Sequence, residues 1–127
     1  MSTQTLITKQ HQENTAWINK LLFYKDDLMV MQHRLDEVTS KNNAADFLKE
    51  VEHFQNQFLI QSEQIDILKH DVKQRENLIE KEVNNNPVAS DHRRIEEDTE
   101  LTNRLTTFEN LFTELRKELL TFIAKWM

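Results

Sequence analysis

Glutamate and histidine side chains at helical spacing are the residues of this sequence best suited to chemistry. Glu50 and His53 stand three apart, the Glu-x-x-His spacing that supplies metal ligands inside four-helix bundles. His33 precedes Glu37 by four residues, close enough on one helix face to share an ion. A metal-binding or ligand-binding helical protein that uses Glu50 and His53 is therefore one hypothesis.

The positions of the histidines argue against that hypothesis. Four histidines, His33, His53, His70 and His92, fall outside the apolar repeat around them, on predicted helix faces turned to water. A metal held inside a bundle needs inward-pointing ligands from at least two helices. In a chain with 22 Asp and Glu and 5 His, chance produces several such spacings. We therefore expect no metal and no other cofactor, and Glu50 with His53 stays as the alternative.

Glycine and cysteine are both absent from the sequence. Phosphate-cradling loops, dinucleotide-binding turns and nucleophile elbows need backbone geometry that glycine adopts most easily, so none of them is expected. Thiolate zinc sites and cysteine nucleophiles are excluded outright. An enzyme whose carboxylates meet only on assembly is a third hypothesis, but nothing in the spacing selects a pair. We predict a protein without enzymatic activity.

The charge balance bears on the class of partner. Sixteen Lys and Arg against 22 Asp and Glu give a net charge of −6, which repels a phosphate backbone and an anionic membrane surface. No window approaches the ~20 apolar residues of a membrane span, and the first residues lack the apolar run of a signal peptide. We expect a cytoplasmic protein with neither nucleic acid nor membrane as its partner.

Two short polar segments, residues 40–43 and 84–87, interrupt an otherwise helical pattern. The asparagines of the first segment can end a helix in the left-handed backbone conformation, and Asn43 can cap the next helix. In the second segment, Asn86 suits an N-cap and Pro87 the first helical position. These breaks predict a single domain over residues 1–127, with helices at about 5–39, 44–83 and 88–125 and residues 1–5 frayed.

An apolar stripe with alternating steps of three and four runs along each predicted helix. Its members are Leu21, Tyr24, Leu28, Met31, Leu35 and Val38; Ala44, Phe47, Val51, Phe54, Phe58, Gln61, Ile65, Leu68, Val72, Arg75 and Ile79; and Leu101, Leu105, Phe108, Phe112, Leu115, Leu119, Phe122 and Trp126. Such a seven-residue repeat predicts coiled-coil-like heptad packing, and the short loops predict an all-α, antiparallel, up-down-up bundle of three long helices. With Trp17 on its first helix, this architecture resembles spectrin-like repeats and syntaxin-type regulatory bundles, although no motif assigns the chain to either family.

A second apolar row lies beside each stripe and widens the predicted core face. It consists of Ile18, Leu22, Leu48, Leu59, Leu111 and Ile123. Such a widened face suits a helix that touches two neighbours, which favours three helices in one bundle over an extended coiled coil.

Folding the chain at its two loops predicts which polar residues share a layer. Tyr24 should lie near Gln61, with Phe112 alongside, and its phenol should donate a hydrogen bond to the Gln61 amide. Arg75 should lie near Asp98 and close to Asn14. Either layer could fix the register of the helices.

Several apolar residues of the first helix fall away from its main stripe, so another chain could cover them. The interface candidates are Ile18, Leu22, Phe23, Met29 and Val30, with Trp126 near the C-terminus. Methionine adapts well to such contacts. The leading hypothesis is therefore a non-enzymatic interaction or scaffolding module, a rigid rod that forms a homodimer or holds a partner helix.

Overall fold

Three helices make up almost all of the computed structural model, which describes the backbone of residues 3–85 and 91–126 and the side chains of residues 6–81 and 99–126. Helix α1 spans Thr3–Thr39, α2 spans Ala45–Asn85 and α3 spans Asp91–Trp126. No strand occurs among these residues. The prediction of an all-α chain of three long helices is confirmed. At about 1.5 Å per residue, each helix is roughly 55–60 Å long.

The helix boundaries differ from the predicted ones by three residues or fewer. α1 begins at Thr3, two residues before the expected start. α3 begins at Asp91, three residues later than expected. The predicted cap at Asn86 and the helix start at Pro87 lie outside the described residues.

The first loop ends α1 in a different way from the one the sequence suggested. No described residue has a positive φ angle, so the predicted left-handed asparagine is wrong. Instead, the Asn42 side-chain amide donates to the backbone carbonyls of Val38 (3.1 Å) and Trp126 (3.3 Å). Asn42 thereby satisfies a carbonyl at the C-terminal end of α1 and ties it to the end of α3. α2 starts one residue later than predicted, with the N–H of Leu48 bonded to the carbonyl of Ala44 (3.0 Å).

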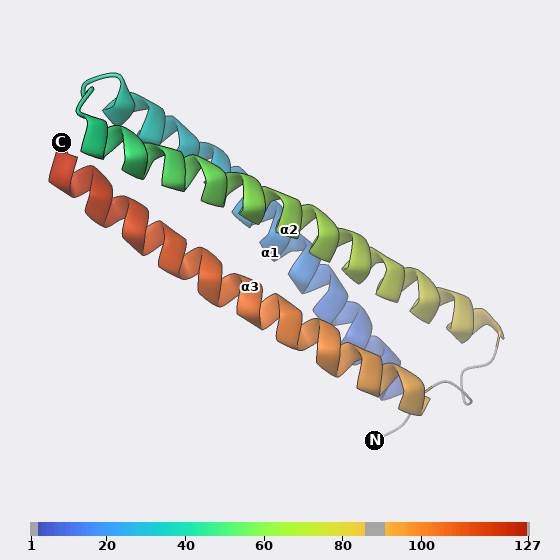
Figure 1. Ribbon diagram of the computed structural model, residues 1–127. Coiled ribbons are helices and arrows are strands. Elements are labelled where there is room, and N and C mark those ends of the chain that lie inside the picture. Colours follow the sequence, from blue (N-terminus) through green and yellow to red (C-terminus); the bar gives the residue numbers. More distant parts are fainter. Residues whose placement is uncertain (1–2, 86–90, 127) are drawn as a thin grey trace.

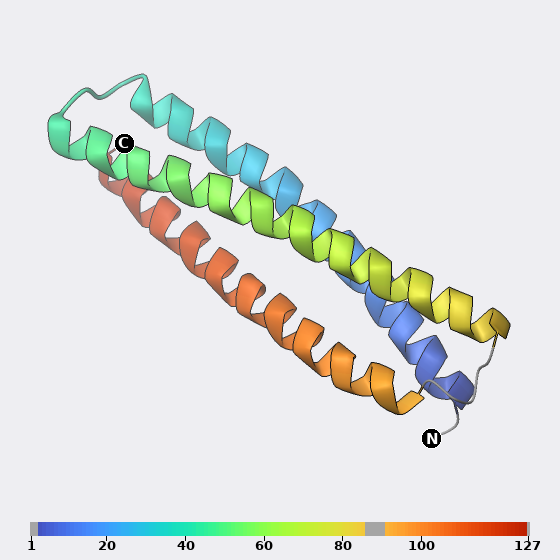
Figure 2. The ribbon, with the colours of Figure 1, turned by 45° about the vertical axis from the view of Figure 1, so that its right-hand side comes forward.

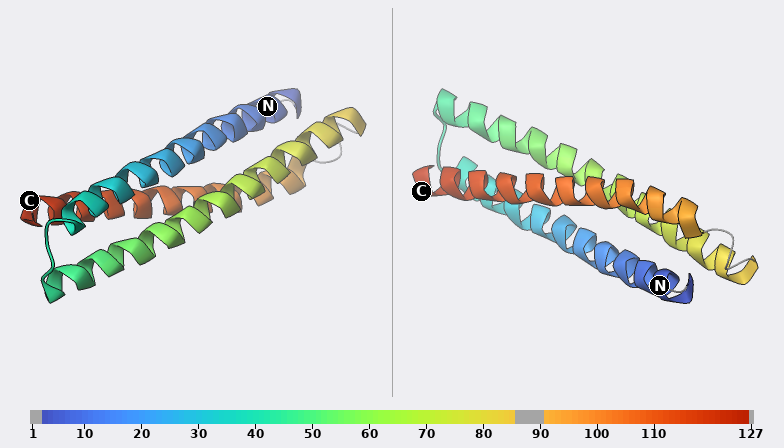
Figure 3. Two further views of the ribbon diagram at one scale, coloured as in Figure 1. Left: turned by 90° about the horizontal axis from the view of Figure 1, so that it is seen from above. Right: turned by 90° about the horizontal axis from the view of Figure 1, so that it is seen from below.

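The helices pack side by side along the rod. Figure 1 shows α2 running back beside α1 and α3 returning in the direction of α1, so that the C-terminus lies near the first loop. Figure 2 shows the same order from another side, and Figure 3 shows the helices inclined to one another. The contacts agree, because His11 meets Glu76 whereas Lys25, further along α1, meets Asp66, earlier on α2. α1 and α2 therefore run in opposite directions.

The predicted stripes form the core of the rod. Of the stripe positions, all are buried except Ala44, which is exposed, and Tyr24 and Trp126, which are partly buried. One continuous cluster of apolar side chains runs from Leu21 on α1 and Leu101 on α3 to the Phe122 end of the bundle. Removing these side chains from water is the main driving force for the fold. In the part of the chain that the structure describes, no helix is long and apolar enough to cross a membrane.

The predicted widening of the core face is mostly wrong. Ile18 and Ile123 pack against the core while partly buried. The other four members of the second row, Leu22, Leu48, Leu59 and Leu111, are 44–65 % exposed. Charged side chains occupy the flanks of the core in several places: Lys25 pairs with Asp66, Arg116 with Asp27 and Arg104 with Asp71. A narrow apolar stripe flanked by ion pairs is therefore enough to close this bundle.

Aromatic rings fill the end of the rod that holds the first loop. Phe47 on α2 stacks on Phe122 of α3, with ring centroids 5.3 Å apart and planes inclined by 12°. The Trp126 ring meets Phe47 edge to face at 5.0 Å, and Phe54 lies 5.1 Å from Phe122. This aromatic end, defined by Phe47, Phe54, Phe122 and Trp126, joins α2 to α3.

Candidate functional site

Four interface candidates form an exposed apolar surface on α1. Leu22 is 46 % exposed, Phe23 61 %, Met29 60 % and Val30 49 %. Leu22 and Met29 are seven residues apart, as are Phe23 and Val30, so each pair stands on one side of the helix two turns apart. Exposed Asp26 lies between the two pairs. We call these four apolar residues the α1 outer face.

The other two interface candidates belong partly to the bundle. Ile18 and Trp126 are both partly buried and pack against the core. The Trp126 indole N–H donates to Glu50 Oε2 (3.1 Å), and its ring contacts Phe47. Little of either side chain is left for a partner.

Glu50 and His53, the proposed metal ligands, take part in separate contacts. Glu50 accepts the hydrogen bond from Trp126. The exposed His53 ring has its Nε2 3.9 Å from Glu118 Oε2 and lies edge to face on Phe54. Over the described ranges, no three or more His, Cys, Asp or Glu side chains gather where they could hold a metal ion. The structure does not bring Glu50 and His53 together with a third ligand.

The histidines whose side chains are described all turn to solvent. His11, His33, His53 and His70 are exposed, which confirms the predicted outward position of the last three. The side chain of His92, also predicted to face water, lies outside the described side chains. His11 bonds to Glu76 through its Nδ1. These positions leave the interior of the bundle without an imidazole among the described side chains.

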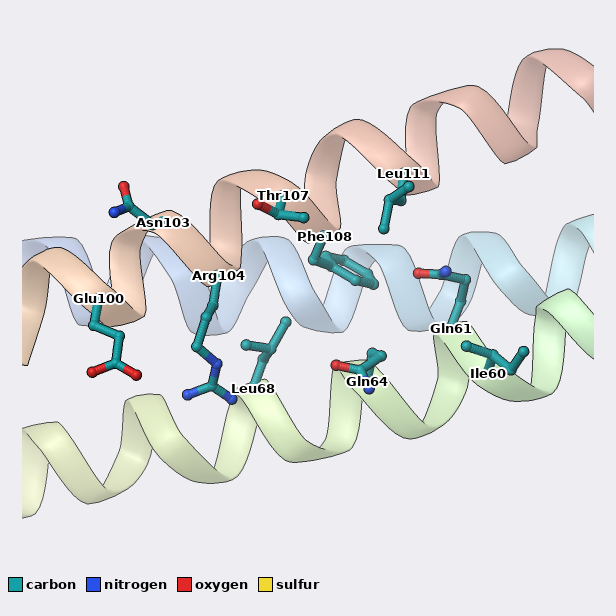
Figure 4. Close-up of a pocket in the computed structure, with 10 residues that line it drawn as sticks. All are labelled: Ile60, Gln61, Gln64, Leu68, Glu100, Asn103, Arg104, Thr107, Phe108 and Leu111. Carbon is teal, nitrogen blue, oxygen red and sulfur yellow. The ribbon is translucent and has the colours of Figure 1, made fainter.

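A groove of about 510 Å³ runs between α2 and α3. Its walls carry the apolar side chains Ile60, Leu68, Phe108 and Leu111 (Figure 4). Polar side chains line the rest of it: Gln61, Gln64, Glu100, Asn103, Arg104 and Thr107. We call this hollow the α2–α3 groove. A mostly apolar concave site with a few polar groups is the usual form of a binding site.

Gln61 and Tyr24 do not form the predicted hydrogen bond. The Tyr24 hydroxyl donates instead to Glu109 Oε2 on α3 (2.7 Å). Gln61 is only 5 % exposed, and within the described chain its Oε1 has no hydrogen-bond partner. The prediction that Phe112 lies beside Tyr24 is confirmed, since their ring centroids are 4.7 Å apart. A carboxylate is the stronger acceptor for a phenol, which accounts for the choice of Glu109.

The surroundings of Tyr24 change its acidity. Burial raises the pKa of the Tyr24 phenol to about 12, and the hydrogen bond to Glu109 and the charge of that carboxylate add to the rise. The nearby Arg116 acts in the opposite direction. Each of these charges matters because the phenolate would have to form in a partly desolvated place. Tyr24 therefore stays a neutral hydrogen-bond donor over the whole physiological range.

A polar layer joins α1 to α2 at the end of the rod opposite the aromatic rings. Buried Arg75 donates from Nε to Asn14 Oδ1, which confirms the predicted contact between these residues. Asn14 is 1 % exposed and donates from Nδ2 to Glu76 Oε2 (2.8 Å). The side chain of Asp98, the other predicted neighbour of Arg75, lies outside the described side chains. We call His11, Asn14, Arg75 and Glu76 the polar end.

Sequence reasoning missed the two carboxylates that complete these contacts, Glu76 and Glu109. Both directly follow a stripe residue in the chain, Arg75 and Phe108 respectively, so they stand at the edge of the core. The available signal was an acidic residue directly after a stripe residue. The α2–α3 groove had no comparable signal, because it depends on how closely two helices approach.

Comparisons with protein-family models, with curated proteins and with solved structures gave no match for this chain.

Proposed function

We propose that the chain is a non-enzymatic interaction module, a rigid helical rod that binds a second copy of itself or a partner helix through the α1 outer face. The observation that supports this is the exposure of Leu22, Phe23, Met29 and Val30, four large apolar side chains within nine residues of one helix. Single exposed apolar residues are common on soluble proteins. Four of them on two turns form a patch of the kind that marks contact sites.

The shape of this patch suits a helical partner. The two pairs, Leu22 with Met29 and Phe23 with Val30, follow the seven-residue spacing at which another helix can interdigitate its own apolar side chains. Phe23 and Met29, at 61 and 60 % exposed, offer the largest unburied surface. Removing such side chains from water is favourable by roughly 25 cal/mol for each Å², and the loss of translational and side-chain freedom on association offsets part of this gain. Asp26, between the pairs, would favour a partner with a basic or hydrogen-bond-donating group at that point.

The test combines sedimentation equilibrium of the purified protein with a pull-down from its native cells, using wild type and the variant Phe23→Glu/Met29→Glu. We expect the wild type to self-associate or to retain a reproducible partner, and we expect the double variant to do neither. Leu59→Glu is the matched control, because Leu59 is 65 % exposed but lies on α2. Circular dichroism verifies that the variants remain helical. Retention of binding by the double variant, or an equal loss in Leu59→Glu, would contradict the assignment to the α1 outer face.

Metal binding is not proposed, because no contact of the described residues favours it. Glu50 is bonded to Trp126 and His53 lies beside Glu118. A cytoplasmic location and the exclusion of nucleic acid and membrane partners remain predictions that rest on composition.

A further inference from the structure

The α2–α3 groove contains a buried acceptor that the bundle does not use. Only 5 % of Gln61 is exposed to solvent. Its Oε1 nevertheless has no hydrogen-bond donor among the described residues. Figure 4 shows this side chain rising from α2 toward α3, between Ile60 and Phe108, with its oxygen end on the Phe108 side. A buried carbonyl without a donor is costly. A hydrogen-bond donor that reached Gln61 Oε1 would therefore recover this cost.

The seam between α2 and α3 offers more room than the groove alone. A second hollow of about 640 Å³ lies further along it, toward the aromatic end, where Phe54 and Phe122 form its apolar floor. Both hollows take their walls from α2 and α3 only. Along α2 the two hollows reach from Phe54 to Leu68, which is 14 residues or about 20 Å. Residues 55–59, between them, line neither hollow. A small molecule would fill one hollow, whereas a helix laid along the seam would contact both.

We propose that the seam between α2 and α3 binds an amphipathic helix of another protein, which carries one hydrogen-bond-donating side chain within its apolar stripe. The donor, from a residue such as Asn, would pair with Gln61 Oε1. The apolar residues on either side of it would enter the two hollows. This site goes beyond the proposed function, because it lies on α2 and α3 and binds its helix independently of the α1 outer face.

The charges along the seam give the partner helix a direction. Lys49, Lys117 and Lys125 line the second hollow. Glu50 and Glu118 line it too and keep their charges, because the indole N–H of Trp126 is neutral and His53 is charged only when protonated. Lys117 lies 4.0 Å from Glu114, so the excess of positive charge in this hollow is three lysines over two carboxylates. At the other end, Glu100 lines the α2–α3 groove, whose Arg104 is paired with Asp71. The partner helix should therefore be acidic where it covers Phe54 and Phe122 and should not be acidic near Glu100.

The test uses two designed peptides of about three heptads each, labelled with a fluorophore. Both have leucine in the stripe and glutamate at one end, and they differ at one central stripe position, which is Asn in the first and Leu in the second. Fluorescence anisotropy measures their affinities for wild type and for Gln61→Leu. We expect wild type to prefer the Asn peptide and the variant to prefer the Leu peptide, with the ratio of affinities changing about tenfold, as for one hydrogen bond.

Variants at the rim locate the binding surface. Leu111→Lys, at a side chain that is 55 % exposed on the groove wall, should abolish binding of the Asn peptide. Met29→Lys, at a similarly exposed residue of the α1 outer face, should leave it unchanged. A peptide with lysine in place of its glutamates should bind more weakly than the acidic one.

Five results would overturn the proposal. The first is that neither peptide binds wild type, and the second is that Gln61→Leu leaves the peptide preference unchanged. The third is that the peptides fail to bind but phenol, a small molecule with one hydrogen-bond donor, raises the melting temperature of wild type and not of Gln61→Leu. This result would assign a small-molecule site. The fourth is self-association that Leu111→Lys abolishes, which would assign the seam to a second copy. The fifth is that Met29→Lys abolishes peptide binding and Leu111→Lys does not. This result would reject the seam as the binding site and would support the α1 outer face.

Discussion

At the aromatic end of the rod, α2 and α3 meet through stacked rings, whereas at the polar end α1 and α2 meet through hydrogen-bonded side chains. Phe47 and Phe122 gain from burial in any arrangement that keeps them dry, since apolar packing has little directional preference. Asn14 is buried to a similar degree, but it is satisfied only where Arg75 and Glu76 stand opposite it. The difference indicates that the aromatic end contributes stability and that the polar end selects the register of α1 against α2.

Removing the central ring of the aromatic end should have the largest effect on stability. Phe47→Ala should lower the free energy of unfolding by about 3–5 kcal/mol, because Phe47 is fully buried between Phe122 and Trp126 and its loss leaves a cavity. Urea denaturation followed by circular dichroism measures the change. Leu48→Ala, at the exposed neighbour, serves as the control. If Phe47→Ala lowered the free energy of unfolding no more than Leu48→Ala does, the stacked rings would contribute little to stability.

At the polar end, Asn14→Ala should lower the free energy of unfolding by about 2 kcal/mol, which is less than the effect of Phe47→Ala. The substitution removes two hydrogen bonds to charged side chains, from Arg75 and to Glu76, and leaves these groups poorly solvated. Asn19→Ala, at an exposed asparagine of the same helix, should be nearly neutral. Denaturation curves of both variants measure the difference. A larger effect for Asn14→Ala than for Phe47→Ala would reverse the comparison.

Tyr24 lies between the two ends and tests whether a satisfied polar contact stabilises the rod. Tyr24→Phe should lower the free energy of unfolding by about 1 kcal/mol at neutral pH, because the hydrogen bond to Glu109 is lost. The phenol titrates at about 12 in the folded chain and at about 10 in the unfolded chain. Between these values the unfolded chain holds fewer protons, so the stabilisation is fully present below pH 10 and is lost as the pH rises toward 12.

Because the chain has one tyrosine, the absorbance of tyrosinate reports this pKa directly. Glu109→Gln should lower it, since the carboxylate contributes to the rise both by hydrogen bonding and by its charge. A folded-state titration near pH 10 in the wild type would contradict the contact.

Gln61 is the opposite case in the middle of the rod, a polar group that the described chain leaves without a donor. Gln61→Leu should raise the free energy of unfolding by up to about 1 kcal/mol, because it replaces a buried, unsatisfied carbonyl by an apolar side chain of similar size. Gln64→Leu, on the exposed rim of the same groove, should change stability little. Thermal denaturation compares the two. A destabilised Gln61→Leu would show that the amide is satisfied in solution.

Much of the fold could be predicted from the sequence because heptad spacing and helix breaks are local properties. The stripe from Leu21 to Val38 specifies which side of α1 is buried, and the polar residues 40–43 specify where the chain turns. The contact of Arg75 with Asn14 followed from folding the chain at its loops. The second apolar row misled the prediction, because an apolar residue beside the stripe can either pack or remain exposed, as Ile18 and Leu22 do respectively.

What the sequence by itself determined is the number of helices, the buried side of each and the scarcity of groups for catalysis. Only the tertiary structure decided that Tyr24 bonds to Glu109, that Gln61 is left without a donor, and that α2 and α3 enclose a groove. The physical reason is that helical periodicity is a local property of the chain, whereas contacts between helices join residues far apart in the sequence. Helical periodicity depends on residues three or four positions apart, whereas a hydrogen bond or a groove depends on displacements of about 1 Å between helices distant in the chain.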